Sequence, residues 1–263
     1  MKQRMYIRML LLFVMTGSAV LSYGQKTIAL DNWFNRETHA KTGKIFHYTW
    51  DDTENSGFSI MAQTFRDMGA SLLTLESAPT ARNLNTAGVY IIVDPDTTSE
   101  NPMPNYVQPA DIKAIAKWVR KGGVLVLMSN DKPNAEFTHF NQLASVFGFR
   151  FRPVTLNPVE GRNWDMGAET VFPDHPLFKG VRKIYMKETA PIVLGKNAIA
   201  LVRDNGDGEV FIAETEFGKG YVLAISDPWL YNEYVDNRRL TADFDNDKAL
   251  ENFCSFLVSK AKR

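Results

Sequence analysis

Hydrophobic residues along the chain form two kinds of pattern, which predict alternating strands and helices. Continuous apolar runs at residues 89–93 (VYIIV) and 124–128 (VLVLM) are typical of strands that are covered on both faces. Between these runs, residues 108–120 place apolar side chains at helical spacing, and Pro109 suits the first turn of such a helix. Residues 58–68 show the same helical period. A strand–helix–strand order with buried strands predicts parallel strands joined by right-handed crossovers.

The rest of the chain adds shorter elements, and the pattern changes after residue 149. Short apolar runs are separated there by turns rich in glycine and asparagine, which predicts antiparallel hairpins. The sequence therefore predicts a three-layer α/β sandwich with antiparallel hairpins at one edge of its sheet. The further expected strands are residues 27–30, 45–50, 71–75, 192–194, 198–203, 210–215 and 221–225, and the further expected helices are residues 137–147 and 249–258.

The first 24 residues have the features of an export signal. Lys2, Arg4 and Arg8 form a basic start, residues 9–20 are apolar, and small residues stand at the expected cleavage position. The apolar run is shorter than the about 20 residues that a membrane-spanning helix needs, although a retained N-terminal anchor is the alternative. We expect a signal peptide at residues 1–24, a single domain at residues 25–263, a periplasmic or secreted location, and no stable membrane insertion after cleavage.

Charge and cysteine content narrow the classes of partner. The chain has 30 basic and 30 acidic residues, and removal of the signal leaves 27 basic residues against the same 30 acidic ones. This balance gives no electrostatic footprint for nucleic acid, so no nucleic-acid partner is expected. The single cysteine, Cys254, falls in an apolar helical pattern, where core packing is its expected role.

Polar side chains follow three of the apolar strands. Asp94, Asn130 and Asp227 each come within two residues of the end of such a run. The carboxyl ends of parallel strands meet at one edge of a sheet, so these side chains could converge on one site. The alternative is that they only cap the helices that follow. The candidate ligand-binding residues are His47, Trp50, Asp94, Asp96, Asn130, Asp227, Trp229, Tyr231 and Asn232, with His47 and Trp50 included on condition that residues 45–50 form a parallel strand.

Motifs for metal binding or nucleophilic catalysis are absent. No HExxH, CxxC or GxSxG occurs, Asp94 and Asp96 lack the remainder of a calcium loop, and residues 205–208 (NGDG) suit a tight turn between strands. We therefore expect neither a metal nor a cofactor. Catalysis, if present, would use carboxylates as acid or base, with a histidine assisting. The catalytic candidates are Asp94, Asp227, Glu233, His47 and His175.

Aromatic residues beside acids and amides, as in residues 226–234 (SDPWLYNEY), suit a carbohydrate. The apolar face of a sugar ring stacks on an aromatic ring while its hydroxyl groups form hydrogen bonds. A protein–protein surface favours the same tryptophan and tyrosine residues and is the alternative.

Several segments carry a resemblance to known families. Residues 174–181 (DHPLFKGV) and 218–228 (GKGYVLAISDP) resemble the class I glutamine amidotransferase-like superfamily, including its ThuA-like branch. Residues 47–59 (HYTWDDTENSGFS), 90–97 (YIIVDPDT) and 226–234 resemble more specifically a domain of the DUF4350 type. Such domains are appended to unsaturated glucuronyl and rhamnogalacturonyl hydrolases of Bacteroidetes. The resemblance implies a flavodoxin-like, amidotransferase-like sandwich and a role in polysaccharide degradation.

The chain departs from these families at their catalytic positions. Amidotransferases carry a nucleophilic cysteine where this chain has residues 129–131 (SND), and a His-x-Glu where it has residues 226–228 (SDP). The resemblance therefore implies no glutamine hydrolysis. We expect an exported accessory domain that binds a uronic-acid- or rhamnose-containing oligosaccharide, or docks on a polysaccharide-degrading enzyme. The alternatives are a hydrolase or lyase acting on unsaturated uronyl oligosaccharides and a purely structural interaction domain.

Overall fold

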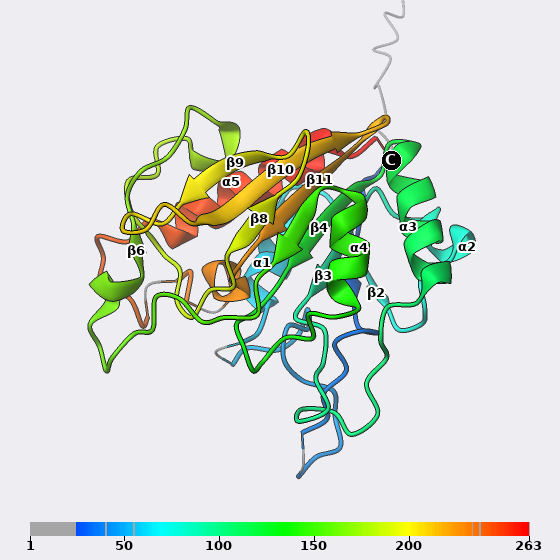
Figure 1. Ribbon diagram of the computed structural model, residues 1–263, viewed down its shortest axis with the longest axis horizontal. Coiled ribbons are helices and arrows are strands. Elements are labelled where there is room, and N and C mark those ends of the chain that lie inside the picture. Colours follow the sequence, from blue (N-terminus) through cyan, green and yellow to red (C-terminus); the bar gives the residue numbers. More distant parts are fainter. Residues whose placement is uncertain (1–24, 40, 55, 233, 237, 263) are drawn as a thin grey trace, which may run out of the picture.

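The computed structural model describes residues 25–39, 41–54, 56–232, 234–236 and 238–262 (Figure 1). The expected signal peptide and the catalytic candidate Glu233 lie outside these residues. In the described part of the chain, no helix has both the length and the apolar character that crossing a membrane would require.

A seven-stranded sheet with the order β2-β1-β3-β4-β11-β10-β9 forms the centre of the molecule. The first five strands in this order are parallel to one another, whereas β10 is antiparallel to both β11 and β9. The prediction of a largely parallel sheet with antiparallel hairpins at one edge is therefore confirmed. The strands are β1 (Thr27–Asp31), β2 (Ser71–Leu75), β3 (Val89–Val93), β4 (Val124–Met128), β9 (Ile199–Arg203), β10 (Val210–Phe217) and β11 (Gly220–Ile225).

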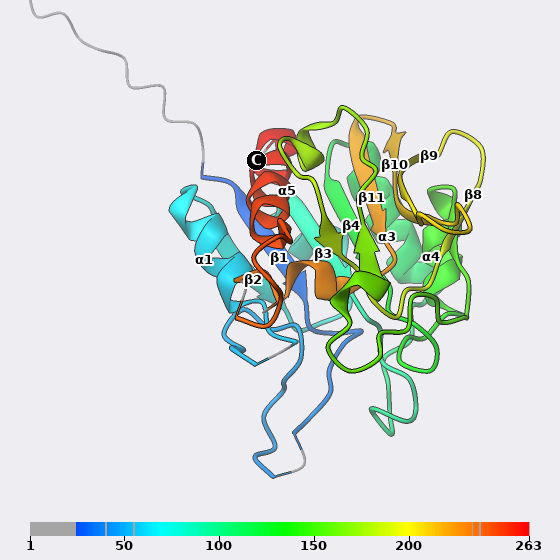
Figure 2. The same ribbon diagram turned by 90° about the vertical axis from the view of Figure 1, so that its left-hand side faces the viewer.

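Helices cover both faces of the sheet, because successive side chains of a strand point to opposite sides. In β3, Val89, Ile91 and Val93 belong to one apolar cluster, while Tyr90 and Ile92 belong to the other. Figure 2 shows the resulting three layers, with α1 and α5 on one side and α3 and α4 on the other. The helices are α1 (Ser59–Asp67), α2 (Ala81–Leu84), α3 (Pro109–Arg120), α4 (Phe140–Val146) and α5 (Asn246–Lys260).

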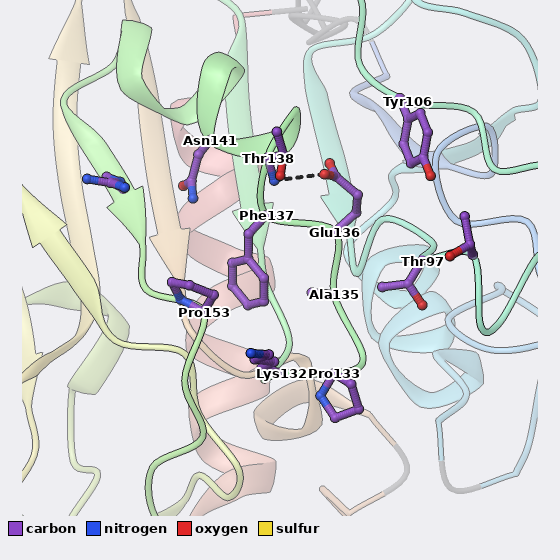
Figure 3. A pocket seen from close by; sticks show the side chains of 12 residues that line it. Thr97, Tyr106, Lys132, Pro133, Ala135, Glu136, Phe137, Thr138, Asn141 and Pro153 are labelled. Carbon is purple, nitrogen blue, oxygen red and sulfur yellow. Dashed lines mark hydrogen bonds between the residues drawn. The ribbon is translucent and has the colours of Figure 1, made fainter.

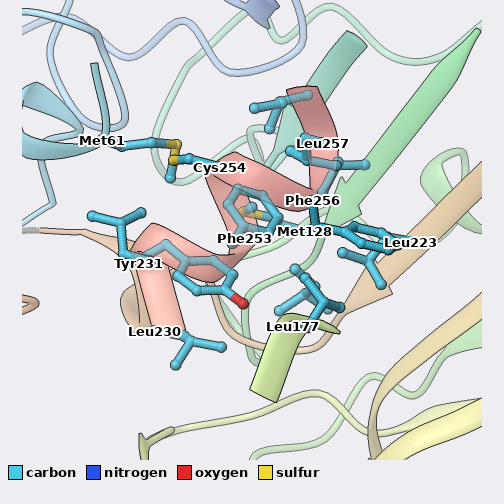
Figure 4. Packing of buried hydrophobic residues seen from close by; sticks show 14 of the residues in the cluster. Met61, Met128, Leu177, Leu223, Leu230, Tyr231, Phe253, Cys254, Phe256 and Leu257 are labelled. Atoms are coloured by element: carbon cyan, nitrogen blue, oxygen red, sulfur yellow. The ribbon is translucent and has the colours of Figure 1, made fainter. Parts of the chain in front are cut away.

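The core between α5 and the sheet is rich in aromatic residues (Figure 4). Phe253 of α5 stacks on Tyr231, with ring centroids 4.2 Å apart and planes 22° from parallel. Cys254 is fully buried in the same cluster and forms no disulfide. Its expected role in core packing matches this position.

Three local expectations were wrong. Residues 45–50 form no strand, since only an isolated bridge joins Ile45 to Thr38 and the backbone of His47 and Tyr48 is left-handed, with φ of 62° and 44°. The helix expected from residue 137 begins at Phe140, because the carboxylate of Glu136 accepts the backbone N–H groups of residues 138–140.

The third error concerns residues 192–194. They form β8 (Ile192–Leu194), which pairs with β5 (Phe149–Phe151) in a separate two-stranded sheet and does not extend the main one. A further small sheet joins β6 (Ala168–Glu169) to β7 (Ile184–Tyr185). Three short 3₁₀ helices lie in this half of the chain: η1 (Trp164–Gly167), η2 (Pro176–Phe178) and η3 (Pro228–Tyr231).

Candidate functional site

The carboxyl ends of β2, β1, β3, β4 and β11 lie at one edge of the sheet, which we call the carboxyl edge. In a sheet of this order, ligands commonly bind between β1 and β3, where the direction of the chain crossovers reverses. Here the loops that follow these two strands are bonded to each other. The side-chain amide of Asn35 donates to the carbonyl of Asp94 at 2.8 Å, and both carboxylate oxygens of Asp96 accept the N–H of Arg36 at 3.0 Å. The chain's own residues thus occupy the switch point.

Asp31 organises the loop after β1. Its Oδ2 accepts the N–H groups of Trp33, Phe34 and Asn35, and its Oδ1 accepts the hydroxyl of Tyr90 at 2.5 Å. Burial raises the pKa of this carboxyl to about 6, although the hydrogen bonds act in the opposite direction. Asp31 was not among the sequence candidates, although it directly follows the strand expected at residues 27–30, as Asp94 directly follows the strand at residues 89–93.

We expect the Asp31→Asn variant to lose part of the pH dependence of stability. The pKa of Asp31 is raised in the folded state, so the folded protein holds more protons than the unfolded chain between about pH 4 and 6. The stability that this carboxyl contributes at low pH is therefore lost as pH rises through about 6. This shift in the pKa of Asp31 corresponds to about 3 kcal/mol in the free energy of unfolding. Urea unfolding from pH 4 to 7 should show a smaller decline for Asp31→Asn than for the wild type. Parallel curves for the two proteins would contradict the assignment.

Asp94 and Asn130, two of the sequence candidates, meet at the carboxyl edge. The amide of Asn130 donates to Oδ2 of Asp94 at 2.9 Å. The backbone of Asp94 is left-handed, with φ of 44°, and its buried Oδ1 has no hydrogen-bond partner among the described residues. Burial, followed by the charge of Glu100, raises the pKa of Asp94 well above its usual range. Burial, followed by the charge of Asp94, raises the pKa of the Tyr48 phenol well above its usual range, so buried Tyr48 faces this pair.

The candidates of residues 226–234 are mostly built into the core. Asp227 is completely buried and caps η3: its Oδ1 accepts the N–H of Trp229 at 2.7 Å, and its Oδ2 accepts the N–H of Lys187 at 2.8 Å. Burial raises its pKa to about 7. Asn232 accepts the N–H of Tyr234 at 3.0 Å, and Tyr231 lies in the core against α5. The capping alternative therefore describes Asp227. Among the candidates of this segment that the structure describes, Trp229 keeps part of its side chain exposed.

Trp50 is built into the core, whereas His47 lies 3.7 Å from the carboxylate of Glu37, whose charge contributes to the raised pKa of Asp94. Trp50 is 8% exposed, donates its indole N–H to the carbonyl of Leu73 and packs on Phe65. His47 lies in the loop that replaces the expected strand, and burial lowers its pKa.

His175 caps η2 and lies 3.4 Å from the carboxylate of Glu214. It also packs on Phe256, which contacts Tyr221 at the start of β11. The structure thus places this histidine away from the carboxyl edge. Among the residues that the structure describes, no group of three or more His, Cys, Asp or Glu side chains is placed to hold a metal ion.

A hollow of about 590 Å³ opens at the carboxyl edge beyond Asp94 and Asn130, and we call it the edge hollow (Figure 3). Loops that follow β3 and β4 form most of it, and Arg150 of β5 contributes from the side. In Figure 3, Tyr106 and Thr97 lie on one side of the segment that carries Glu136, and Pro153 lies on the other. The lining residues are Thr97, Thr98, Tyr106, Lys132, Pro133, Ala135, Glu136, Phe137, Thr138, Asn141, Arg150 and Pro153.

Some side chains of the edge hollow maintain its shape. Glu136 caps the turn before α4, and Asn141 bonds both the N–H and the carbonyl of Phe151. The ring of Tyr106 stacks on His139, with centroids 4.6 Å apart and planes 15° from parallel. These contacts hold the loops in position, which is the arrangement expected of a preformed binding site.

Several side chains of the edge hollow can meet a ligand. Phe137 and the partly exposed ring of Tyr106 offer apolar surface, and Thr98 offers an exposed hydroxyl. Neither Lys132 nor Arg150 forms an ion pair with any residue in the described part of the chain. None of the sequence candidates lines this hollow. Most of its residues come from loops without a hydrophobic period or motif, so the main sequence signal was their position after β3 and β4.

Comparisons with known proteins show the fold. No family model matches the chain, and no curated protein matches it. The mmIFT52 N-terminal domain superimposes with a TM-score of 0.67 and 13% identity over 89% of this chain and 98% of that domain. Cytoplasmic protein STM1381 from Salmonella typhimurium LT2 superimposes with a TM-score of 0.58 and 14% identity, over 90% of this chain and 100% of that protein. The β-galactosidase from Rahnella sp. R3 superimposes with a TM-score of 0.54 and 13% identity. The match covers 90% of this chain but only 31% of that enzyme.

Proposed function

We propose that this chain is an exported accessory domain of polysaccharide degradation, and that it binds an oligosaccharide containing uronic acid at the edge hollow. The observation that carries this proposal is the combination of two aromatic rings, Tyr106 and Phe137, with two cations that have no ion-pair partner among the described residues, Lys132 and Arg150, around a hollow of about 590 Å³. A sugar ring would stack on an aromatic face, and a cation would hold a carboxylate. The volume is typical of small-molecule sites.

Two further observations support an accessory role. The chain resembles domains appended to uronyl hydrolases, and a unit of the same fold accounts for about a third of the length of a β-galactosidase. That similarity concerns the fold alone, so the glycan and the partner enzyme belong to the proposal. Docking on a polysaccharide-degrading enzyme is compatible with glycan binding, because the edge hollow occupies one edge of the sheet only.

Calorimetric titration of residues 25–263 with oligogalacturonate and with a neutral oligosaccharide of equal length tests the proposal. We expect saturable binding of the acidic sugar, and a loss of about tenfold or more in affinity in Tyr106→Ala and in Lys132→Ala. Lys113→Ala is the matched control, since Lys113 is exposed on α3 away from the hollow. Unchanged affinity in both hollow variants would remove the edge hollow as the glycan site.

A second candidate function, a hydrolase or lyase acting on unsaturated uronyl oligosaccharides, is favoured by one observation. Asp94 combines a left-handed backbone, a buried oxygen without a partner among the described residues, and a strongly raised pKa. Such strain and perturbed pKa values are concentrated at catalytic sites, and a carboxyl whose pKa is raised keeps its proton to higher pH and is suited to act as a general acid. The same titration mixtures should be assayed for products. Products that disappear in Asp94→Asn would favour the enzyme and contradict the purely accessory role.

A further inference from the structure

A second hollow, of about 490 Å³, lies between the segment around η1 and the segment that leads from η3 to α5. We call it the arginine hollow, and it shares no residue with the edge hollow. None of its described lining residues is acidic. They are Arg162, Trp164, Tyr234, Arg238, Arg239 and Thr241.

The aromatic wall of the arginine hollow is fixed by the core behind it. Trp164 and Tyr234 contact each other edge to face, with ring centroids 6.3 Å apart. Tyr234 is also stacked on buried Tyr185 at 5.6 Å and lies edge to face against Trp229 at 5.3 Å. The ammonium of Lys187 lies 4.3 Å from the centre of the Trp229 ring. The tryptophan selected from the sequence therefore supports this wall from behind.

Three acidic residues that the structure describes near the arginine hollow have cationic partners, and one of these partners, Arg238, itself lines the hollow. Asp165 accepts a hydrogen bond from the ammonium of Lys183 at 2.6 Å, and Asp243 contacts the same ammonium. Asp236 forms an ion pair with Arg238. The guanidinium of Arg239 lies 5.6 Å from the centre of the Tyr234 ring, so it extends along the wall.

We propose that the arginine hollow is a separate site that binds an oxyanion carried on a sugar ring, with a uronate carboxylate as the first choice. A guanidinium forms paired hydrogen bonds with a carboxylate or a sulfate. Arg162 lines the hollow, is exposed and forms no ion pair with any residue that the structure describes, so its guanidinium is the one that meets the oxyanion. Trp164, which is partly exposed, supplies the face on which the ring stacks. The choice of a glycan as carrier of the oxyanion rests on the proposed function, whereas the site itself does not.

Affinity for oligogalacturonate and for its methyl ester, measured with the wild type, Arg162→Ala, Arg162→Lys and Arg66→Ala, tests this site. Arg162 is exposed, so its replacement should leave folding intact, and Arg66 is an exposed control on α1. The wild type should bind the acid at two sites, of which Arg162→Ala should weaken one about tenfold or more and leave the other unchanged. We expect Arg162→Lys to recover part of this loss, and the methyl ester to bind equally weakly to all four proteins. Added salt should weaken binding of the acid in the wild type.

Equal affinity of the wild type for the acid and its methyl ester would overturn the proposal, as would an Arg162→Ala variant that binds the acid normally. A sulfated oligosaccharide, inorganic phosphate and oligothymidylate are measured alongside. Preference for the sulfated sugar would keep the site and change the source of the oxyanion, whereas tighter binding of phosphate or oligothymidylate would exclude a glycan. If Tyr106→Ala binds normally and Arg162→Ala does not, the edge hollow fails while the arginine hollow stands.

Discussion

The Phe253→Ala variant is expected to lose about 3–5 kcal/mol of unfolding free energy. Phe253 is completely buried on α5, and its ring stacks on that of Tyr231 (Figure 4). Removal of the ring leaves a cavity between α5 and η3, which the stiff aromatic neighbours cannot fill. Because η3 carries the start of the segment that leads to the arginine hollow, this contact also positions the segment.

Urea unfolding, followed by circular dichroism, measures the effect. The control is Ser255→Ala, an exposed position two residues further along the same helix, which should change stability by no more than about 0.5 kcal/mol. A loss below about 1 kcal/mol in Phe253→Ala would show that the aromatic stack contributes little and that α5 packs more loosely than the structure indicates.

The second large effect is expected at Gly220, the first residue of β11. A Cβ atom at this position would lie 2.0 Å from the carbonyl oxygen of Val119 and 2.4 Å from that of Gly123. Both contacts are with backbone atoms, so the strand would have to move away from α3 and β4. We expect Gly220→Ala to lose at least about 3 kcal/mol, the upper end of what overpacking costs.

A glycine in open space separates the steric effect from the conformational one. Gly208 lies in the turn between β9 and β10 and has φ of 73°, and no atom lies within 4 Å of the point that a Cβ atom would occupy there. Gly208→Ala should therefore cost only about 1–2 kcal/mol, which is the strain of a left-handed alanine. Thermal unfolding of the two variants gives the comparison. Equal losses at the two positions would contradict the steric argument for Gly220.

The buried acids differ in whether the fold alone explains their position. Asp31, Asp96 and Asp227 accept backbone N–H groups and hold loops in position, so their polar character is explained by the fold. Asp94 is different, because one of its oxygens has no partner among the described residues and its backbone is strained. It is the buried acid whose replacement is most informative about catalysis.

The parallel core could be predicted because its strands are short runs of apolar residues that are buried on both faces. Val89–Val93 and Val124–Met128 form β3 and β4 with the expected boundaries, and Pro109 begins α3. The hairpins were also predictable, since residues such as Gly208 and Gly218 adopt the left-handed conformation that tight turns need. These signals are local, and they reflect burial and backbone sterics directly.

The position of side chains beyond the strand ends could not be predicted in the same way. Residues 45–50 have the composition of a strand but form a loop. The two sides of β1 are already taken by β2 and β3, so no position beside β1 is left for them in the sheet. Asp227 follows β11 as expected, yet its carboxylate points inward to two backbone N–H groups. An aspartate at a strand end has the same sequence signature whether it meets a ligand or caps a turn.

By itself, the sequence determined the layered α/β architecture, the parallel centre and the antiparallel edge, because these follow from the period and length of apolar runs. Tertiary structure alone decided where the exposed functional groups lie. Tyr106 and Lys132 form one hollow with Arg150 of β5, and Arg162 and Arg239 form another, although each set comes from separate segments of the chain. Loops have no periodic constraint, so their side chains come together only through packing of the elements that they connect.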